Sequence, residues 1–401
     1  GHKDGKQIPI DTILKKLSPL FLDRDIGKSA HNANYDITVL ARHGMPVRNL
    51  EFDTMLAAHM MGKQSIGLKA LALEYFGKEM TPITDLIGTG RKQITMDQVP
   101  INKAAPYACA DADFTKRLNA KLRKEIGETN TSDLYKNLEV PLVQVLVRMQ
   151  LNGVLLNQEL LSQMSSELAE RLSAVETDVY DILGHEFNLN SSQQLSGVLF
   201  NELRLPPSKK TKTGYSTDAS SLESLKHILN TKDSETVDPR AIGILDQILE
   251  YRQLSKVKST YVDSLPTLVN PHTKRIHTRY NQTGSSTGRL SSNDPNVQNI
   301  PVRTDLGRRV RQAFIAKNAP GNILLAADYS QIELRIMAHY SEEPELIRAF
   351  KNDLDIHTRT ASLVYSVEEK EVTSEQRRTA KVVNFGIMYG AGPFRMSKEL
   401  G

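Results

Sequence analysis

One stretch of the chain changes from apolar to polar at a single residue: Ile323-Leu-Leu-Ala-Ala-Asp328-Tyr-Ser-Gln-Ile-Glu333. The apolar run Asn322–Ala327 predicts a short buried strand that stops abruptly at Asp328. A helical pattern follows from Gln331 onward. The stretch therefore predicts a strand that delivers an acidic side chain to the start of a helix.

Asp328 and Glu333 each have a chemical and a structural interpretation. An aspartate where a strand leaves the core can meet a hard cation with little side-chain freedom, and oxygen ligands suit magnesium. A single aspartate at a strand end is also common in proteins without a metal. Ser330 and Glu333 have the S/T-x-x-E spacing of a capping box, which would explain Glu333 by helix chemistry alone. The segment by itself leaves both interpretations open.

A second stretch, Thr373–Gly390, predicts a helix over Ser374–Met388. Thr373 and Gln376 have the spacing of a capping box at its start. Four side chains then follow at strict intervals of four and form one slowly drifting stripe: Arg377, Lys381, Phe385 and Tyr389. Two cations followed by two aromatic rings suit a ligand with a polyphosphate at one end and a flat ring at the other. The alternative is a solvated helix whose aromatic residues pack into a core.

A third stretch is rich in glycine, serine and threonine and holds one basic residue, Arg289, between Ser285 and Ser292. Amides follow at Gln298 and Asn299, and such side chains can reach acceptors in a nucleic-acid groove or on sugars. A plain turn would account for the same residues.

Basic residues concentrate around this loop. The whole chain carries a net charge of +4, but Tyr251–Arg311 holds eleven basic and three acidic residues, so its net charge of +8 leaves −4 elsewhere. Such a segment can neutralise a phosphate backbone. A solvated surface without a polyanionic partner is the alternative that charge alone leaves open.

Length and composition bound the class of protein. At ~100–200 residues per domain, 401 residues predict two to four domains. The 39% apolar and 24% charged residues are ordinary for a globular protein. No apolar run approaches the ~18 residues of a membrane span. The single cysteine, Cys109, excludes an internal disulfide and a zinc site built from several cysteines.

Local patterns predict the order of elements along the chain. Residues 1 to about 127 read as mixed α/β, and the rest up to about residue 257 reads mainly as helix. The individual predictions are a strand at Leu50–Asp53, a helix at Ala104–Leu122, a break at Gly127–Asn130, a helix at Asp133–Met149, a turn at Asn152-Gly153, one or two helices at Gln158–Phe187, a polar loop at Pro206–Tyr215, more helix at Leu222–Val257, a strand at His277–Tyr280 and a loop at Asn281–Asn293.

Taken together, these motifs resemble the bacterial DNA polymerase I family, also called family A. The resemblance rests on the order and spacing of five segments: Thr287-Gly-Arg-Leu-Ser-Ser292, Gln298-Asn-Ile-Pro-Val-Arg303, Arg311-Gln-Ala-Phe-Ile315, Asp328-Tyr-Ser-Gln-Ile-Glu-Leu-Arg-Ile-Met-Ala-His339 and Arg377-Arg-x-Ala-Lys-x-x-Asn-Phe-Gly-x-x-Tyr-Gly390. It implies an α/β multidomain fold, in which a partial RNase H-like exonuclease domain of the DEDD type precedes a right-hand polymerase. The expected divisions are exonuclease 1–127, connecting helix and thumb 128–263 (the thumb itself about 133–263), palm 264–340 and fingers 341–401.

The resemblance also implies roles for the matching residues of the polymerase. Asp328 would bind two catalytic Mg²⁺ ions, for which Mn²⁺ is the alternative, with the Tyr329 carbonyl as a further ligand. Glu333 would be the steric gate against a ribose 2′-hydroxyl. The remaining contacts to the incoming dNTP would come from His357, Arg377 and Lys381 at the triphosphate, Phe385 at the sugar and Tyr389 at the templating pair.

The same family pattern implies DNA contacts and a second site. Arg289 would reach the minor groove at the primer terminus, and the duplex nearby would be touched by Gln298, Asn299 and Arg303. Two further segments, His31-Asn32-Ala-Asn-Tyr35-Asp36 and Tyr107-Ala-Cys-Ala-Asp111, resemble the second and third motifs of a DEDD 3′–5′ exonuclease. The exonuclease candidates are therefore Asn32, Asp36, Tyr107 and Asp111. Tyr107 and Asp111 are four residues apart and share a helix face, so the tyrosine could orient a water beside a metal.

Two family motifs have no counterpart in the sequence. The first exonuclease motif, D-x-E, should precede Asp36; Asp53-Thr-Met55 follows it and lacks the glutamate, so it is rejected. A His-Asp-Glu tripeptide carrying the second palm carboxylate is also absent. We therefore expect a chain truncated at both ends and inactive in synthesis by itself, and whether the exonuclease site is active is left open.

The expected function is template-directed DNA synthesis in replication or repair: dNTPs are added to a primer 3′-hydroxyl by two-metal phosphoryl transfer, with a 3′–5′ proofreading exonuclease as a second activity. The expected partners are primer–template DNA and dNTPs, and no membrane is expected. The expected protein is a monomer in the cytoplasm of a bacterium, associated with the nucleoid, or is encoded by a phage and located in the host cytoplasm. An organellar location is left open. One alternative is a single-subunit RNA polymerase, which Glu333 disfavours. Another is a non-catalytic DNA-binding remnant, which intact Asp328, Arg377 and Lys381 disfavour.

Overall fold

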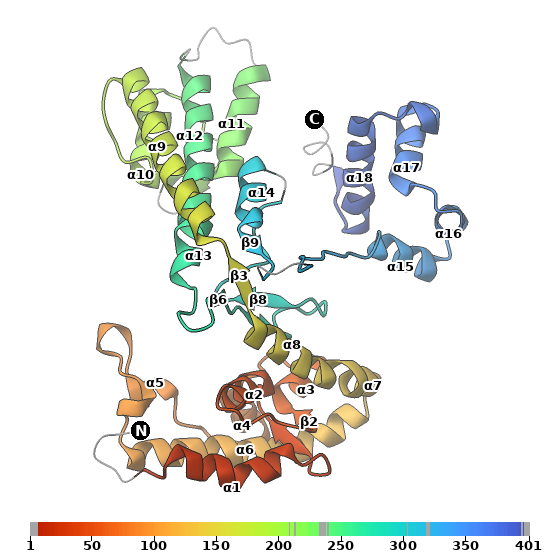
Figure 1. Cartoon of the computed structure of the whole chain (residues 1–401). Helices are drawn as coiled ribbons and strands as arrows, with labels where there is room; N and C mark the ends of the chain where they lie inside the picture. Colours follow the sequence, from red (N-terminus) through yellow and green to blue (C-terminus); the bar gives the residue numbers. More distant parts are fainter. Residues whose placement is uncertain are drawn as a thin grey trace. The chain divides into compact units, whose positions relative to one another are not determined.

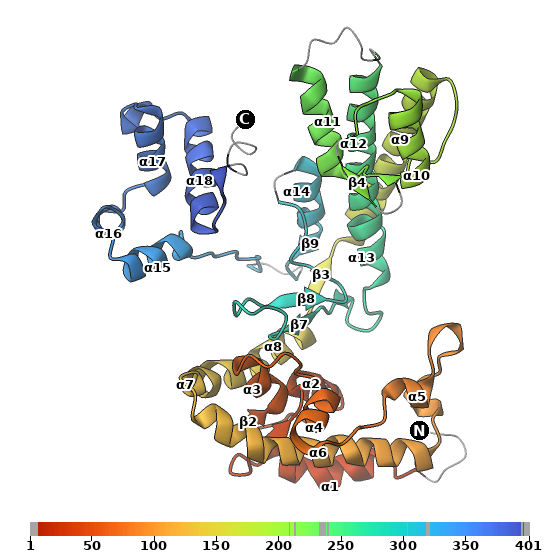
Figure 2. The same ribbon diagram turned by 180° about the vertical axis from the view of Figure 1, so that it is seen from behind.

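The computed structural model describes residues 7–207, 209–211, 214–231, 238, 240–302, 304–317, 321–393 and 396. It divides into two compact units, Gly1–Ile323 and Leu324–Gly401, which are described separately below (Figures 1 and 2). No helix in these residues is long and apolar enough to cross a membrane.

The first part of unit 1 is mixed α/β. Two strands, β1 (Lys28–Ala30) and β2 (Leu50–Asp53), pair in parallel, which confirms the strand predicted at Leu50–Asp53. The helices and 3-10 turns around them are α1 (Ile10–Leu22), α2 (Ala33–Arg42), α3 (Thr54–Met60), α4 (Leu68–Phe76), α5 (Ile83–Ile87), η1 (Gly90–Lys92), η2 (Met96–Gln98) and α6 (Ile101–Gly127). The predicted helix Ala104–Leu122 lies inside α6, and the predicted break coincides with its end at Gly127.

A helical segment leaves this part at α7 (Ser132–Leu134) and continues through a π-turn, η3 (Tyr135–Glu139), into α8 (Val140–Asn152). Tyr135, Val143 and Val147 bury their side chains in the same core as Phe52 and Leu122. Gly153 then adopts a positive φ of 57°, which is the predicted turn, and β3 (Val154–Leu156) begins. The segment Asp133–Met149 is therefore helical, as predicted, with one π-turn inside it.

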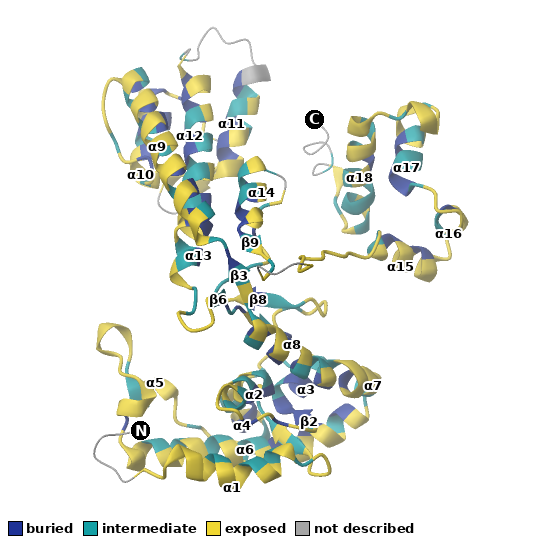
Figure 3. Cartoon of the chain, viewed as in Figure 1, coloured by how far each residue is buried: buried dark blue, intermediate teal, exposed yellow. Residues whose placement is uncertain are grey.

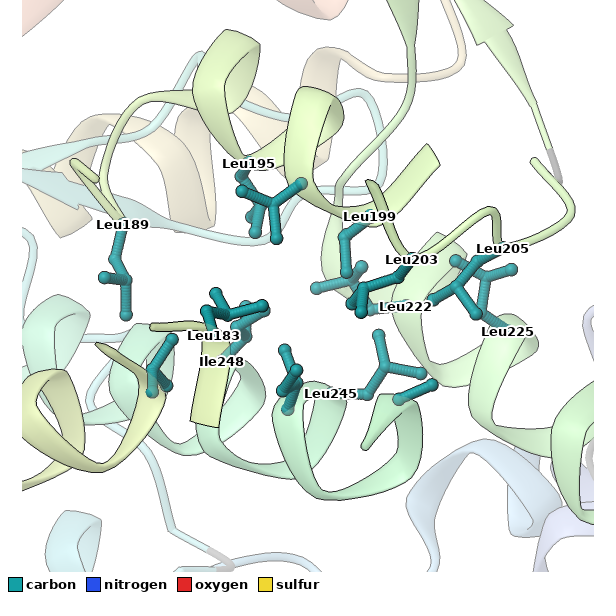
Figure 4. Packing of buried hydrophobic residues seen from close by; sticks show 14 of the residues in the cluster. Leu183, Leu189, Leu195, Leu199, Leu203, Leu205, Leu222, Leu225, Leu245 and Ile248 are labelled. Atoms are coloured by element: carbon teal, nitrogen blue, oxygen red, sulfur yellow. The ribbon is translucent and has the colours of Figure 1, made fainter. Parts of the chain in front are cut away.

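A long helix, α9 (Gln158–Leu183), spans two hydrophobic cores. Its first buried residues, such as Leu161 and Leu168, pack in one core, and its last, such as Val175 and Val179, pack in another. The second core is completed by α10 (Ser192–Ser196), η4 (Gly197–Glu202), α11 (Ala219–Thr231) and α12 (Ala241–Val257), whose leucines and isoleucines interdigitate (Figure 4). The apolar spacing predicted α9, α11 and α12, but it did not predict α10 and η4. Helix α9 is one helix rather than two.

The polar segment predicted as a loop, Pro206–Tyr215, contains two short strands that the sequence did not predict. Strands β4 (Lys210–Thr211) and β5 (Gly214–Tyr215) pair antiparallel. Tyr215 packs its ring edge-on against Phe200, with centroids 5.2 Å apart. This contact attaches β5 to η4.

The last part of unit 1 contains two small antiparallel sheets. One has the order β6–β3–β9, formed by β6 (Arg275–Ile276) and β9 (Phe314–Ile315) on either side of β3. The other pairs β7 (Arg279–Asn281) with β8 (Ser291–Asn293). The strand predicted at His277–Tyr280 is therefore only partly right, because its first two residues lie between β6 and β7 and its last two lie in β7. The remaining elements are η5 (Lys258–Val262), α13 (Ser264–Thr267) and α14 (Asp305–Gln312).

Unit 2 is helical. It consists of α15 (Ile332–Ser341), α16 (Pro344–Lys351), α17 (Ile356–Tyr365), η6 (Glu369–Glu371) and α18 (Ser374–Met388). Its small core joins Leu334, Ala349 and Ile356 from three helices, and Phe385 of α18 packs against them. Few residues of these helices are buried, and the others are exposed or intermediate (Figure 3).

Two predictions around Asp328 are wrong. Asn322–Ala327 is not a strand: the run is irregular, and Ile323, Leu324 and Leu325 are 79%, 59% and 85% exposed. A strand needs a hydrogen-bonded neighbour, and no described strand pairs with this run. The Ser330–Glu333 capping box is also absent, because Gln331 takes a left-handed conformation (φ 52°) and becomes the residue before α15.

Candidate functional site

Helix α18 presents the predicted stripe of side chains. The predicted capping box is present: the Gln376 N–H donates to Thr373 Oγ1 at 3.2 Å, and the Thr373 N–H donates to Gln376 Oε1 at 2.9 Å. The rings of Phe385 and Tyr389 stack at 17° with centroids 6.5 Å apart. Tyr389 is 64% exposed, whereas Phe385 is half-buried against the core of unit 2. Phe385 therefore serves the core and still presents part of its ring to the stripe.

Helix α17 packs against α18 and places a histidine behind the stripe. His357 is only 2% exposed, and its ring centroid is 5.7 Å from that of Phe385. Burial lowers the pKa of His357; the Asp355 carboxylate opposes this shift, and the positive charges of Arg377 and Lys381 add to it. A buried, neutral histidine therefore packs directly against one residue of the stripe, Phe385.

Two polar residues that the sequence did not reveal as site residues connect α17 and α18 by hydrogen bonds. Asn384 places its Nδ2 3.1 Å from Nδ1 of His357 and 3.0 Å from Oγ1 of Thr360. Asp355 accepts a hydrogen bond from Nε of Arg377 at 2.5 Å. Asp355 could have been found as an N-cap, because it stands directly before an apolar helical run. Asn384 carries no comparable local signal.

Asp328 and Tyr329 lie in the irregular segment before α15. Asp328 is exposed, Tyr329 is 80% exposed, and Glu333 is half-buried in the first turn of α15. Asp328 makes no hydrogen bond or ion pair with a described residue. The structure thus brings His357, Arg377, Lys381, Phe385 and Tyr389 together on α17 and α18, but it does not tie Asp328 to them.

The predicted DNA-contacting residues lie at the β7–β8 hairpin and the segment after it. Arg289 is exposed on the connection between the two strands. Gln298 Nε2 donates to the carbonyl of Leu290, the next residue, at 3.1 Å, and the Asn299 carbonyl accepts from the Tyr261 hydroxyl at 2.6 Å. Gln298 is thus held beside Arg289, whereas Arg303 lies outside the described residues.

Three of the four exonuclease candidates line one cleft of about 1160 Å³ in unit 1: Asp36, Tyr107 and Asp111. Partial desolvation, and then the charges of Asp53 and Asp111, raise the pKa of Asp36 to about 6. Desolvation also raises the pKa of Asp111, against the opposing effects of Lys69 and of a hydrogen bond from Tyr107. Lys69 Nζ lies 5.1 Å from the centre of the Tyr107 ring. The cleft therefore holds two carboxyl groups whose charged forms are disfavoured.

Asn32 and Asp53 have structural roles next to this cleft. Asn32 does not line it; its backbone is left-handed (φ 67°) and its N–H donates to Asp53 Oδ1 at 3.1 Å. The Asp53 carboxylate, 1% exposed, also accepts from the N–H groups of Ala33 at 2.6 Å, Met55 at 2.8 Å and Leu56 at 3.2 Å. Four backbone donors therefore hold this carboxylate in the turn between β2 and α3.

The described residues do not bring together enough carboxylates for a centre with two cations. They contain no group of three histidine, cysteine, aspartate or glutamate residues arranged to hold a metal ion. Asp328 supplies one carboxylate, and Asp36 and Asp111 supply two in a different place. Two cations ~3.5–4 Å apart need several carboxylates to offset their repulsion.

Comparisons with known proteins identify the family. Residues 158–401 match the family model for DNA polymerase family A, and residues 2–127 match that for a 3′–5′ exonuclease. The chain therefore belongs to DNA polymerase family A. Its architecture is accordingly an exonuclease domain followed by a family A polymerase fold, as the resemblance implied.

Relatives of the chain carry the same description. It is 46% identical to DNA polymerase I of Chloroflexus aurantiacus, over 100% of this chain and 42% of the relative, and 43% identical to that of Pseudomonas aeruginosa, over 99% and 42%. The polymerase domain of Pol1 from M. smegmatis, solved with DNA primer-template and dNTP, is similar at a TM-score of 0.80 and 34% identity, covering 98% of this chain and 63% of that one. The chain thus spans about two fifths of the length of these curated relatives.

Proposed function

We propose that the chain is part of an enzyme that performs template-directed DNA synthesis, adding dNTPs to a primer 3′-hydroxyl in replication or repair. The observation that carries this proposal is the surface on α17 and α18, where His357 lies beside the stripe of Arg377, Lys381, Phe385 and Tyr389 in a family A chain. The cations of the stripe suit the triphosphate, and its aromatic faces suit the sugar and the base pair.

The roles of the other residues belong to the same proposal. Asp328 and the Tyr329 carbonyl would contribute to binding two Mg²⁺ ions, or Mn²⁺ in their place, which when bound activate the primer hydroxyl and steady the leaving pyrophosphate. Glu333 would exclude a 2′-hydroxyl. Arg289 and Gln298 would contact the primer–template, as would Asn299 and Arg303.

The division into exonuclease 1–127, connecting helix and thumb 128–263, palm 264–340 and fingers 341–401 is likewise proposed. The ends of three elements support it: α6 ends at Gly127, η5 at Val262 and α15 at Ser341. A monomer in the cytoplasm of a bacterium, or encoded by a phage, fits the same proposal.

The test is single-nucleotide primer extension by the full-length polymerase. Arg377→Ala should raise KM for the dNTP by tenfold or more, because a charge-assisted contact to phosphate is lost. Arg378→Ala is the matched control, since Arg378 is exposed on α18 but lies off the stripe. Equal effects of the two variants would contradict the assignment. Uptake of ribonucleotides as readily as dNTPs by the unmodified enzyme would favour an RNA polymerase instead.

A 3′–5′ exonuclease is a second candidate activity, favoured by the Asp36–Asp111 cleft and by the family match over residues 2–127. Digestion of single-stranded DNA by the full-length protein should be lost in Asp111→Asn. Asp113→Asn is the control, because Asp113 pairs on the same helix with Arg117 at 2.9 Å and does not line the cleft. Unchanged digestion in Asp111→Asn would reject this site.

A further inference from the structure

The Asp355 carboxylate performs two tasks at once. It caps the N-terminus of α17: Oδ1 accepts from the N–H groups of His357 at 3.0 Å and Thr358 at 3.4 Å, and Oδ2 accepts from Thr358 Oγ1 at 3.0 Å. The same Oδ2 accepts from Nε of Arg377 on α18 at 2.5 Å. One carboxylate therefore ties the start of α17 to the first turn of α18.

The geometry of this pair leaves the two terminal nitrogens of the Arg377 guanidinium available for other contacts. The guanidinium uses its Nε–H for Asp355, and its two terminal nitrogens make no hydrogen bond with a described residue. A planar guanidinium anchored at Nε has its remaining donors fixed in direction, so less rotational freedom is lost when they bind an anion. His357, two residues after Asp355, is set in place by the same cap.

The charge of the Asp355 carboxylate supports a stable ion pair with Arg377. Burial tends to raise the pKa of Asp355, but the hydrogen bonds from Arg377 and Thr358 and from the backbone at Thr358 and His357 outweigh it, and the pKa lies below its usual value. Asp355 therefore stays ionised at neutral pH. Both side chains are partly exposed, at 44% for Arg377 and 38% for Asp355, so the pair is reachable by a ligand from solvent.

We propose that Asp355 is a positioning residue for nucleotide binding: it orients the Arg377 guanidinium toward the triphosphate and fixes His357 through the same helix cap. This inference rests on the proposed function, since it assumes that Arg377 binds the triphosphate. It adds a residue that binds no nucleotide itself and acts through Arg377.

The variant that isolates the orienting role is Asp355→Asn. Asparagine is as good an N-cap as aspartate, so α17 keeps its cap, but the charge attraction to Arg377 is lost. In steady-state primer extension by the full-length polymerase we expect KM for the dNTP to rise about two- to fivefold, the range for a partly exposed ion pair. The kcat and the thermal unfolding midpoint should stay close to those of the unmodified enzyme.

Two controls make the result specific. Glu369→Gln removes a different acid–arginine pair of α17, with Arg359 at 3.4 Å, and should leave KM unchanged. Asp355→Asn added to Arg377→Ala should have no further effect, because the residue through which it acts is gone.

The inference is overturned if Asp355→Asn raises KM by the same factor with and without Arg377, or if it lowers KM, which would mean that Asp355 competes with the triphosphate. It is also overturned if Arg377→Ala raises KM strongly and Asp355→Asn leaves KM unchanged. Failure of the proposed function looks different: Arg377→Ala itself would then leave KM unchanged.

Discussion

Asn384 on α18 donates a hydrogen bond from Nδ2 to Nδ1 of His357 on α17, at 3.1 Å. The direction follows from the amide group, because its N–H can only donate. Thr360 Oγ1 lies 3.0 Å from Nδ2 and 3.1 Å from Oδ1 of the same amide, and its hydroxyl is within donating distance of that Oδ1 and of the Ile356 carbonyl at 2.9 Å. Nδ1 of His357 is therefore the acceptor, and the ring proton of the neutral histidine lies on Nε2. In this tautomer the one donor left on the neutral ring is Nε2–H.

The first prediction concerns this tautomer. Asn384→Asp should place a carboxylate beside Nδ1 and raise the pKa of His357, whereas burial keeps it below 6.5 in the unmodified protein. An NMR titration of the His357 ring measures the pKa in both proteins. In the unmodified protein, the nitrogen chemical shifts of the neutral ring should show that the proton is on Nε2. A neutral ring protonated on Nδ1 in the unmodified protein would contradict the assignment.

The second prediction concerns the β7–β8 hairpin. Arg289→Ala in the full-length polymerase should reduce primer extension more than primer–template binding, because one groove contact positions the terminus without dominating affinity. Binding itself should weaken steeply with salt, as expected for a segment of net charge +8. Arg279→Ala on the same hairpin, weakly paired with Asp294 at 3.6 Å, is the control. Unchanged extension in Arg289→Ala would remove Arg289 from the proposed DNA contacts.

The third prediction concerns the half-buried ring of Phe385. If this ring faces the sugar, Phe385→Tyr supplies a hydroxyl where a dideoxynucleotide has none. A hydrogen bond of about 0.5–1.5 kcal/mol should then improve the ratio of dideoxy to deoxy incorporation by about two- to twelvefold. Competition between the two nucleotides in primer extension by the full-length enzyme measures this ratio. A ratio that does not move would show that Phe385 faces something else.

The fourth prediction concerns pH and His31. Burial lowers its pKa to about 4, and Nδ1 lies 2.8 Å from Thr54 Oγ1. The unfolded chain therefore binds this proton more readily, so its contribution to folding stability is complete above pH ~6.5 and is lost as pH falls toward 4. Between pH 7.5 and 4.5 the unmodified protein should lose about 2 kcal/mol more than His31→Gln. The measurement is the free energy of unfolding of both proteins as a function of pH. If it falls equally with pH in the two proteins, His31 is not buried in its neutral form.

Elements with a local cause were predictable. The strand Leu50–Asp53, the helix containing Ala104–Leu122 and the capping box at Thr373 follow from spacing over a few residues, and the structure contains all three. The stripe on α18 is also local, because side chains four apart on a helix must lie close together whatever surrounds them.

Local spacing failed where a partner decides the outcome. Asn322–Ala327 has the composition of a buried strand, but a strand also needs a neighbour, and the described residues provide none. Ser330 and Glu333 have capping-box spacing, yet the left-handed backbone at Gln331 moves the start of α15 past the serine. The first prediction lacked a neighbouring strand, and the second lacked the backbone geometry that a capping box requires.

By itself, the sequence determined the family and the stripe of Arg377, Lys381, Phe385 and Tyr389, because motif spacing and helical periodicity are properties of neighbouring residues. Only the tertiary structure decided that Asp355 holds Arg377 and that Asn384 sets the tautomer of His357. Those partners lie 22 and 27 positions apart in the chain, so the packing of α17 against α18 brings them within hydrogen-bond distance. An aspartate or asparagine has no partner written into its own neighbourhood, and the fold supplies it.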